Sequence, residues 1–167
     1  MIRSERIGQI LAGAASKRTL VLGDMVVDEH IIGSARQIAR EAPIPVIDQQ
    51  TRLTVPGGAT NVAANLRSLG CDVAVAGVVG ADAPADHLRQ ELETRGIGTH
   101  GLVTEPNRAT AVKLRVWAGG DRQRAQSMVA RVDHVDSSPF SPSTPQKLSD
   151  YLEEAVPQHD GLIVSDY

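Results

Sequence analysis

A glycine pair in front of a helix is the feature that most constrains how this chain can fold. Gly57 and Gly58 precede a segment in which apolar residues recur at helical spacing as far as Leu69-Gly70. Two adjacent residues without Cβ atoms let another molecule approach the backbone amides at a helix N-terminus. Asn61 adds a donor and an acceptor in the first turn, which suits a hydroxyl-rich ligand. The pattern predicts a small-molecule site, and a plain Gly-Gly turn before a core helix is the alternative.

Composition narrows the class of protein. The chain has 167 residues, about the length of one domain, and 41% of them are hydrophobic but only 2% aromatic. Aliphatic side chains must therefore fill the core, as in parallel strands covered by helices. The net charge is −3 and no basic block occurs, which argues against a nucleic-acid partner. Cys71 is the single cysteine and the five histidines are scattered, so neither a disulfide framework nor a metal site is expected.

The chain shows no membrane or export signal. No apolar stretch approaches the roughly 20 residues that span a bilayer, and the first residues lack a signal-peptide pattern. We therefore expect no membrane partner and a cytoplasmic location.

Strand and helix patterns alternate along the chain. Apolar runs predict strands at 19–22, 73–79, 102–103, 111–117, 126–132 and 161–165, and amphipathic spacing predicts helices at 4–15, 59–69, 83–95 and 146–156. This alternation predicts an α/β fold with a largely parallel sheet and right-handed crossovers. Gly119-Gly120-Asp121 predicts a hairpin turn between two of the strands.

Residues 30–55 differ in character. Short β-prone pieces are interrupted by Pro43 and Pro45 and mixed with charged residues. Because proline restricts such pieces to edge or exposed strands, they predict a small β flap at about 29–56 beside the main sheet.

Ligands of such folds bind beyond the carboxyl ends of the strands. Asp24 follows the first strand there, and its carboxylate can accept two hydroxyl hydrogen bonds from a polyol, with a plain loop or cap aspartate as the alternative. Asp28 is a second candidate, with a plain loop residue as the alternative, whereas Asp82 is better explained as the N-cap of the helix that begins at Ala83.

Two cations share one face of the strand at 111–117. Lys113 and Arg115 alternate with apolar residues and could hold a phosphate on the substrate, or simply form a solvated strand face. The phosphate-binding loop G-x-x-x-x-G-K-[ST] is absent, and Gly23-Asp24 does not continue as G-x-G-x-x-G. Nucleoside-triphosphatases with that loop and dinucleotide-binding folds are therefore set aside.

Several segments resemble the ribokinase-like (PfkB) carbohydrate kinases over nearly the whole chain. The run from Gly57 through Gly70 to Gly80 resembles the first signature of that family, and Leu22 to Asp28 resembles its opening strand and sugar-binding aspartate. Glu41-Ala42-Pro43-Ile44-Pro45-Val46 resembles the D-glycero-β-D-manno-heptose 7-phosphate kinases of the ADP-heptose pathway, and residues 130–133 and 162–167 point the same way.

This resemblance implies a ribokinase-like three-layer sandwich with a mostly parallel sheet and a β lid. Family members transfer the γ-phosphoryl group of ATP, with Mg²⁺, to a sugar hydroxyl, and their lid often pairs two subunits, which implies a homodimer through the flap. By motif, sugar binding falls to Asp24, Gly57, Gly58 and Asn61, with Asp28 and Lys113 as further substrate-binding candidates. The implied substrate is a heptose 7-phosphate on the route to ADP-heptose and the lipopolysaccharide core.

One part of the family pattern is missing. The second signature, with a G-A-G-D core that supplies the catalytic aspartate and the turn around the transferred phosphate, does not occur in the chain. Residues 1–167 are thus expected to be the N-terminal part of a PfkB-type kinase domain, truncated on its C-terminal side. No catalytic residue is assigned, ATP and Mg²⁺ are expected to bind poorly, and the chain alone is expected to be inactive and marginally stable. The alternatives are a non-catalytic sugar-binding or dimerisation module and a kinase for another sugar, such as ribose or fructose.

Overall fold

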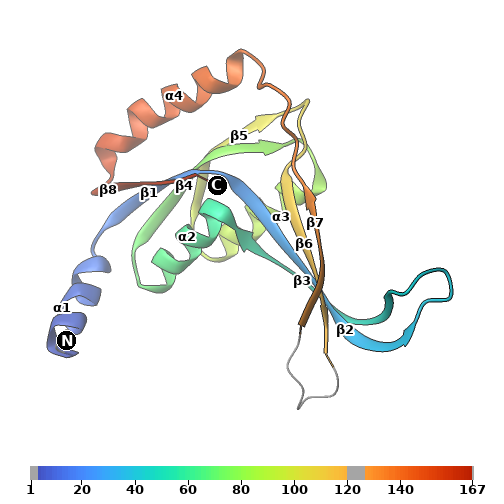
Figure 1. Cartoon of the computed structure of the whole chain (residues 1–167). Coiled ribbons are helices and arrows are strands. Elements are labelled where there is room, and N and C mark those ends of the chain that lie inside the picture. Colours follow the sequence, from blue (N-terminus) through green and yellow to red (C-terminus); the bar gives the residue numbers. More distant parts are fainter. Residues whose placement is uncertain (1–3, 120–126, 167) are drawn as a thin grey trace.

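Two four-stranded sheets organise the described part of the chain (Figure 1). The structure is a computed structural model, and it describes residues 4–119 and 127–166. In chain order the elements are α1 (Ser4–Ala14), β1 (Arg18–Gly23), β2 (Met25–Ile38), β3 (Pro45–Gly57), α2 (Gly58–Ser68), β4 (Asp72–Gly80), α3 (Ala83–Thr94), β5 (Gly98–Glu105), β6 (Ala111–Ala118), β7 (Ser127–His134), α4 (Ser143–Ala155), the short 3₁₀ helix η1 (Val156–Gln158) and β8 (Gly161–Ser165).

Sheet A is the parallel sheet at the centre of a three-layer sandwich. Its strand order is β5-β4-β1-β8, and every neighbouring pair is parallel. Helices α2 and α3 cover one face and α4 covers the other. The three-layer α/β arrangement predicted for the chain is therefore confirmed.

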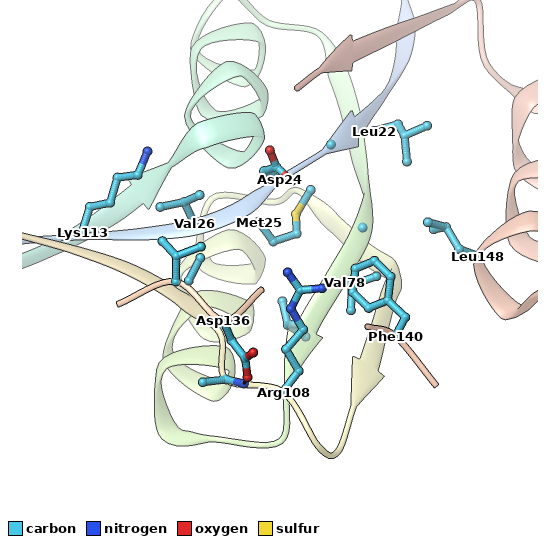
Figure 2. Close-up of a pocket in the computed structure, with 16 residues that line it drawn as sticks. Leu22, Asp24, Met25, Val26, Val78, Arg108, Lys113, Asp136, Phe140 and Leu148 are labelled. Carbon is cyan, nitrogen blue, oxygen red and sulfur yellow. Dashed lines mark hydrogen bonds between the residues drawn. The ribbon is translucent and has the colours of Figure 1, made fainter. Parts of the chain in front are cut away.

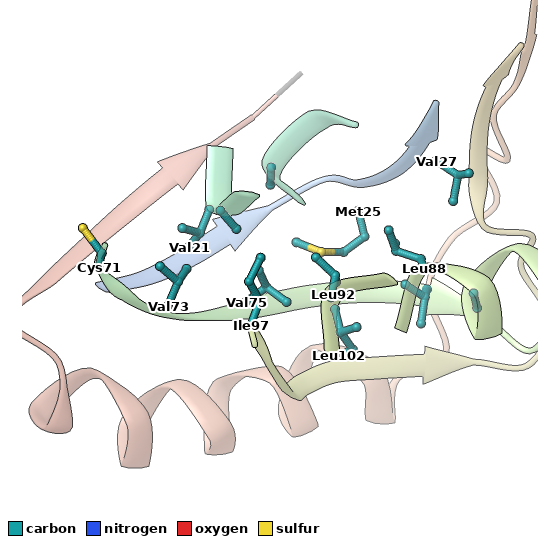
Figure 3. Packing of buried hydrophobic residues seen from close by; sticks show 14 residues of the cluster. Val21, Met25, Val27, Cys71, Val73, Val75, Leu88, Leu92, Ile97 and Leu102 are labelled. Carbon is teal, nitrogen blue, oxygen red and sulfur yellow. The ribbon is translucent and has the colours of Figure 1, made fainter. Parts of the chain in front are cut away.

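The core lies on both faces of sheet A because successive side chains of a strand point to opposite sides. Val21, Val73 and Val75 face α2 and α3, where they meet Leu88 and Leu92 (Figure 3). Leu20 and Ala76, together with Ala155 of α4, form the second cluster on the other face. Full burial of each larger aliphatic side chain contributes about 1.5–3 kcal/mol, so the nearly unbroken apolar runs of β1 and β4 account for this layer.

Sheet B forms the lid and is larger than the flap expected at 29–56. Its order is β3-β2-β6-β7, in which β2 pairs antiparallel with β3 and parallel with β6, while β6 pairs antiparallel with β7. The strands expected at 111–117 and 126–132 thus belong to the lid sheet. The pairing of β6 with β2 joins segments about 85 residues apart, which strand patterns alone do not reveal.

Local features of sheet B agree with its sequence. Pro45 begins β3, and β3 is an edge strand, which fits the restriction that proline imposes. The hairpin turn predicted at Gly119-Gly120-Asp121 lies mostly outside the described residues.

Strand β8 is the edge strand of sheet A next to β1. Val164 of this strand is 64% exposed, so the edge presents apolar surface. None of the helices in the described residues is both long and apolar enough to cross a membrane.

The glycine pair stands where the two sheets meet. Gly58 has a φ of +51°, and a Cβ atom there would lie 2.6 Å from the carbonyl oxygen of Asp24. A Cβ atom on Gly57 would lie 2.7 Å from the carboxyl carbon of Asp28. Gly58 is therefore required by a backbone contact inside the protein itself, whereas a side chain at Gly57 would displace the Asp28 carboxylate.

Replacing Gly58 with alanine should destabilise the fold by about 2 kcal/mol or more, because the side chain adds left-handed strain and a backbone clash. The matched control is Gly8→Ala in α1, where no atom lies within 4 Å of the new Cβ and alanine favours the helix by up to about 1 kcal/mol. Chemical unfolding followed by circular dichroism measures both variants. Equal stability of the two would refute the required role of Gly58.

Candidate functional site

A cavity of about 370 Å³ opens where the carboxyl end of β1 meets sheet B (Figure 2). This edge of a parallel sheet is where ligands of α/β proteins bind, and the volume is near the lower end for small-molecule sites. The polar side chains of its lining are those of Asp24, Arg108, Lys113 and Asp136, and the larger apolar ones are those of Leu22, Met25, Val26, Val78, Val79, Val135, Phe140 and Leu148.

Asp24 links the two sheets and lines the cavity. It is the single residue between β1 and β2, and its backbone N–H donates to the Ser165 carbonyl over 3.2 Å. Its carbonyl accepts a 3.0 Å hydrogen bond from the Ala59 N–H in the first turn of α2. The backbone on both sides of this exposed carboxylate is therefore fixed, which positions the side chain at the cavity.

Lys113 comes to the same cavity from sheet B. It lies on β6 in register with Asp28 of β2 and is half-buried. Of the six predicted substrate-binding residues, Asp24 and Lys113 are those that line the cavity.

The other four lie beside the cavity. Gly57 ends β3 and is the N-cap residue of α2, Gly58 begins the helix, and Asn61 is exposed in its first turn. Gly58 touches the Asp24 carbonyl, and Gly57 touches the Asp28 carboxylate. These glycines are thus next to the cavity through Asp24, and none of the four residues belongs to its lining.

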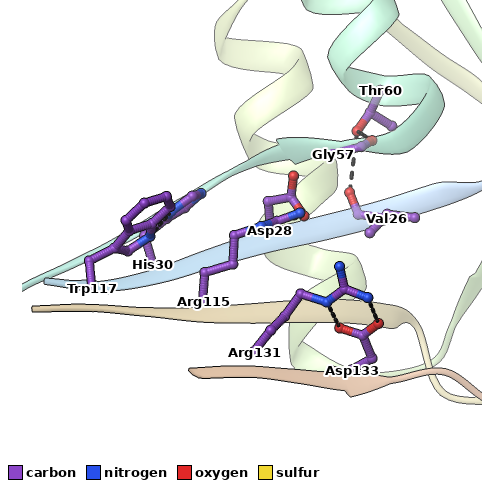
Figure 4. A network of polar contacts seen from close by, with 9 residues as sticks. All are labelled: Val26, Asp28, His30, Gly57, Thr60, Arg115, Trp117, Arg131 and Asp133. Atoms are coloured by element: carbon purple, nitrogen blue, oxygen red, sulfur yellow. Dashed lines mark hydrogen bonds and ion pairs between the residues drawn. The ribbon is translucent and has the colours of Figure 1, made fainter. Parts of the chain in front are cut away.

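The face of sheet B beyond Lys113 carries polar pairs (Figure 4). Arg115 Nη1 lies 2.7 Å from Asp28 Oδ1, an ion pair whose N–H is not aligned for a hydrogen bond, and both side chains are about one-fifth exposed. The next pair joins Trp117 to His30, because the indole N–H donates to the imidazole Nδ1 over 2.9 Å. Asp28 therefore faces Arg115 across the sheet.

Thr60 fastens the start of α2 to the strands. Its buried hydroxyl donates 2.7 Å to the Gly57 carbonyl and 3.4 Å to the Val26 carbonyl. The helix N-terminus is thus held against β2 by a side chain of its own first turn (Figure 4).

Sequence reasoning missed three residues of the cavity. The Arg108 guanidinium lies 4.3 Å from the centre of the Phe140 ring, a cation–π contact. Hydrogen bonds from Ser138, and then from the Ala109 amide, hold the pKa of Asp136 below its ordinary value. Phe140 is the single phenylalanine of the chain and lies in a Ser/Pro-rich loop, which was a usable signal, whereas Arg108 had none.

Asp82 caps α3, as predicted, and also fixes the loop after β5. Its carboxylate accepts from the Ala85 N–H at 3.0 Å, from the Thr110 N–H at 2.8 Å and from the Thr110 hydroxyl at 2.6 Å. Burial acts to raise the pKa of Asp82, but these hydrogen bonds outweigh burial and lower it. Asp82 is therefore a structural anchor next to the cavity.

Glu105 anchors the loop that precedes α4. This residue is 1% exposed, and its carboxylate accepts hydrogen bonds from the Ser141 N–H (2.8 Å), the Ser141 hydroxyl (2.7 Å) and the Thr144 hydroxyl (2.9 Å). The bonds from Ser141 are the largest cause that lowers the pKa of Glu105 to about 2. They join the end of β5 to the start of α4 and so keep Phe140 near Arg108.

Metal ligands do not gather in the described ranges. No group of three or more His, Cys, Asp or Glu side chains lies within reach of one ion in residues 4–119 and 127–166. The poor binding expected for ATP and Mg²⁺ stays a prediction.

Comparison with known proteins defines the class. Residues 17–156 match the pfkB family carbohydrate kinases, and the chain belongs to this family. It resembles most specifically proteins named bifunctional protein HldE: it is 38% identical to the protein of Citrifermentans bemidjiense over 154 residues, covering 92% of this chain and 30% of the relative. The Helicobacter pylori protein is 36% identical over 90% of this chain and 32% of its own length. The chain thus spans about a third of the relatives it matches.

Solved structures share the fold. A carbohydrate kinase from Agrobacterium tumefaciens superimposes with a TM-score of 0.66 at 22% identity, over 89% of this chain and 45% of that one. The acarbose kinase Mak1 superimposes with a TM-score of 0.59 at 22% identity, over 89% and 45%. The ribokinase-like fold is therefore confirmed.

The Glu105 anchor should make stability depend on acid pH. Because its pKa falls from 4.5 to about 2 on folding, its contribution is complete above about pH 4.5 and is lost as the pH falls toward 2. Glu105→Gln should lower the melting temperature at pH 7 by several degrees and weaken the fall in stability between those pH values. Melting curves from pH 2 to 7 measure this.

Glu153→Gln on the exposed side of α4 is the matched control, because it removes the same charge without removing a described hydrogen bond. A Glu105 variant with the pH profile of the control would contradict the anchoring role.

Proposed function

We propose that this chain is the sugar-binding part of an ATP-dependent carbohydrate kinase whose acceptor is a heptose 7-phosphate. The observation that carries the proposal is the cavity in which a carboxylate, Asp24, and a cation, Lys113, meet at the carboxyl end of β1. Membership of the pfkB family supports the kinase class.

Each candidate residue has a chemical role in this proposal. Asp24 accepts hydrogen bonds from sugar hydroxyls, and charge-assisted bonds of this kind are about twice as strong as neutral ones. Asn61 and the amides near Gly57 and Gly58 offer further polar groups at the start of α2, and Lys113 supplies a positive charge for a phosphate. Sheet B contributes Val26, Ala111 and Lys113 to the lining of the site.

The heptose substrate rests on two supports. Residues 41–46 resemble the heptose 7-phosphate kinases, and the relatives that match 90% or more of this chain are named bifunctional protein HldE. On this basis we assign the chain to the formation of ADP-heptose for the lipopolysaccharide core. Kinases of this family use ATP and Mg²⁺, and this chain spans about a third of the length of its relatives, so the proposal covers sugar binding alone.

Calorimetry with D-glycero-β-D-manno-heptose 7-phosphate tests the proposal. The folded chain should bind this ligand, and Asp24→Asn should weaken binding about 10- to 100-fold, because a hydrogen bond to a charged group is worth about 1.5–3 kcal/mol. Asp72→Asn, an exposed position at the amino end of β4, should bind as the wild type does. Absence of binding heat from folded wild-type protein, or equal losses in both variants, would count against the sugar site.

A second candidate function is that of a dimerisation module. In this case sheet B of the kinase fold would pair two copies of the chain. Apolar side chains are exposed on this sheet, among them Leu53 of β3 and Met128 of β7. Such a surface fits a second copy of the lid.

If the lid pairs two chains, the protein should elute as a dimer in size-exclusion chromatography with light scattering, and Leu53→Asp should convert it to a monomer. Leu53 is 46% exposed, and Ile10 of α1 is 53% exposed, so Ile10→Asp is a matched control that should leave the dimer intact. A monomeric wild type, or a dimer that survives Leu53→Asp, would remove this candidate.

A further inference from the structure

Arg108 is a second cation in the cavity, and it comes from a different part of the fold than Lys113. It follows β5 of sheet A, whereas Lys113 lies on β6 of sheet B, and both line the same cavity of about 370 Å³. Figure 2 shows the Arg108 guanidinium directed toward the part of the cavity below Met25. One small space therefore receives positive charge from both sheets.

The Arg108 head group is held in place. The Phe140 ring stacks against it at 4.3 Å, and the negative charge of Asp136 is close enough to interact with it. A ring face attracts a guanidinium but occupies none of its five N–H donors, so this contact orients the group and leaves its edge available for a ligand.

The parts that hold Arg108 are themselves fixed. Asp136 accepts hydrogen bonds from the Ala109 N–H at 3.3 Å and the Ser138 N–H at 2.8 Å. Glu105, just before Arg108 in the chain, binds Ser141, just after Phe140. The arginine and its ring thus sit on two loops that a buried carboxylate ties together, which lowers the entropy lost when a ligand binds.

The chemistry selects the ligand. A planar guanidinium can donate two parallel hydrogen bonds to a phosphate. The Asp24 carboxylate in the same cavity repels a second anion but accepts hydroxyl groups. The volume, near the lower end for ligand sites, suits one sugar phosphate and not a sugar together with a nucleotide.

From this arrangement we propose that Arg108 binds the phosphate group already present on the sugar and thereby selects phosphorylated over unphosphorylated sugars. The inference rests on the proposed function, because it needs a sugar in the cavity. Phe140 and Glu105 act through Arg108 as positioning residues.

Calorimetry with two ligands tests the role of Arg108 in phosphate binding. The ligands are heptose 7-phosphate and the same heptose without phosphate. For the wild type, the phosphate should tighten binding. Arg108→Gln should weaken heptose 7-phosphate about 10- to 100-fold and leave the unphosphorylated heptose unchanged. Arg108→Lys and Phe140→Leu should give intermediate losses, again for the phosphorylated ligand alone. Arg95→Gln, which removes an exposed guanidinium paired with Glu91 on α3, should change neither affinity.

The outcomes separate this inference from the proposed function. If wild-type protein binds neither sugar, the proposed function fails and the inference fails with it. If the wild type binds heptose 7-phosphate but Arg108→Gln loses affinity equally for both sugars, or for neither, the proposed function stands and the inference is overturned. A titration with ATP tests the other source of a phosphate group. If Arg108→Gln lowers the affinity for ATP and not for heptose 7-phosphate, the assignment of Arg108 to the sugar phosphate is overturned.

Discussion

The close packing at Gly57-Gly58 is the contact on which the candidate site depends. The chain leaves sheet A at Asp24 and enters sheet B at Met25, and α2 begins against this crossing. The Ala59 N–H bonds the Asp24 carbonyl, and the missing Cβ atoms of the glycines let the Asp24 carbonyl and the Asp28 carboxylate come close. One short junction therefore sets the position of the strand end, the helix N-terminus and the lid relative to one another.

Two hydrogen-bonded carboxylates, the half-buried Asp82 and the buried Glu105, fix the other side of the cavity. Asp82 joins the end of β4 and the start of α3 to Thr110, and Glu105 joins β5 to the start of α4. Hydroxyl and amide donors surround both carboxylates and favour their charged forms, and that charge strengthens each hydrogen bond. The loops that bring Arg108 and Phe140 to the cavity are consequently rigid parts of the fold.

Much of the fold was predictable because it depends on local patterns. The apolar runs of β1 and β4 predict buried parallel strands, and the helix starts at Gly58 and Ala83 follow from a glycine pair and an aspartate cap. The lid was predicted only in part. Strand β6 pairs with β2 across about 85 residues, and pairing over such a distance leaves no local trace in the sequence.

The sequence by itself determined the α/β class, the family resemblance and the candidates Asp24 and Lys113, because strand alternation and short motifs are local in the chain. Tertiary structure alone decided that these two line one cavity, that Asp28 pairs with Arg115, and that Arg108 and Phe140 join them. The physical reason is that a cavity is made by the packing of distant segments, here β1 and β4 of sheet A, β2 and β6 of sheet B, and the loops that follow β5 and β7. The glycine pair illustrates the difference. The sequence predicts that another group comes close to the backbone at Gly57 and Gly58, and the fold shows that these groups are the Asp28 carboxylate and the Asp24 carbonyl of the chain itself.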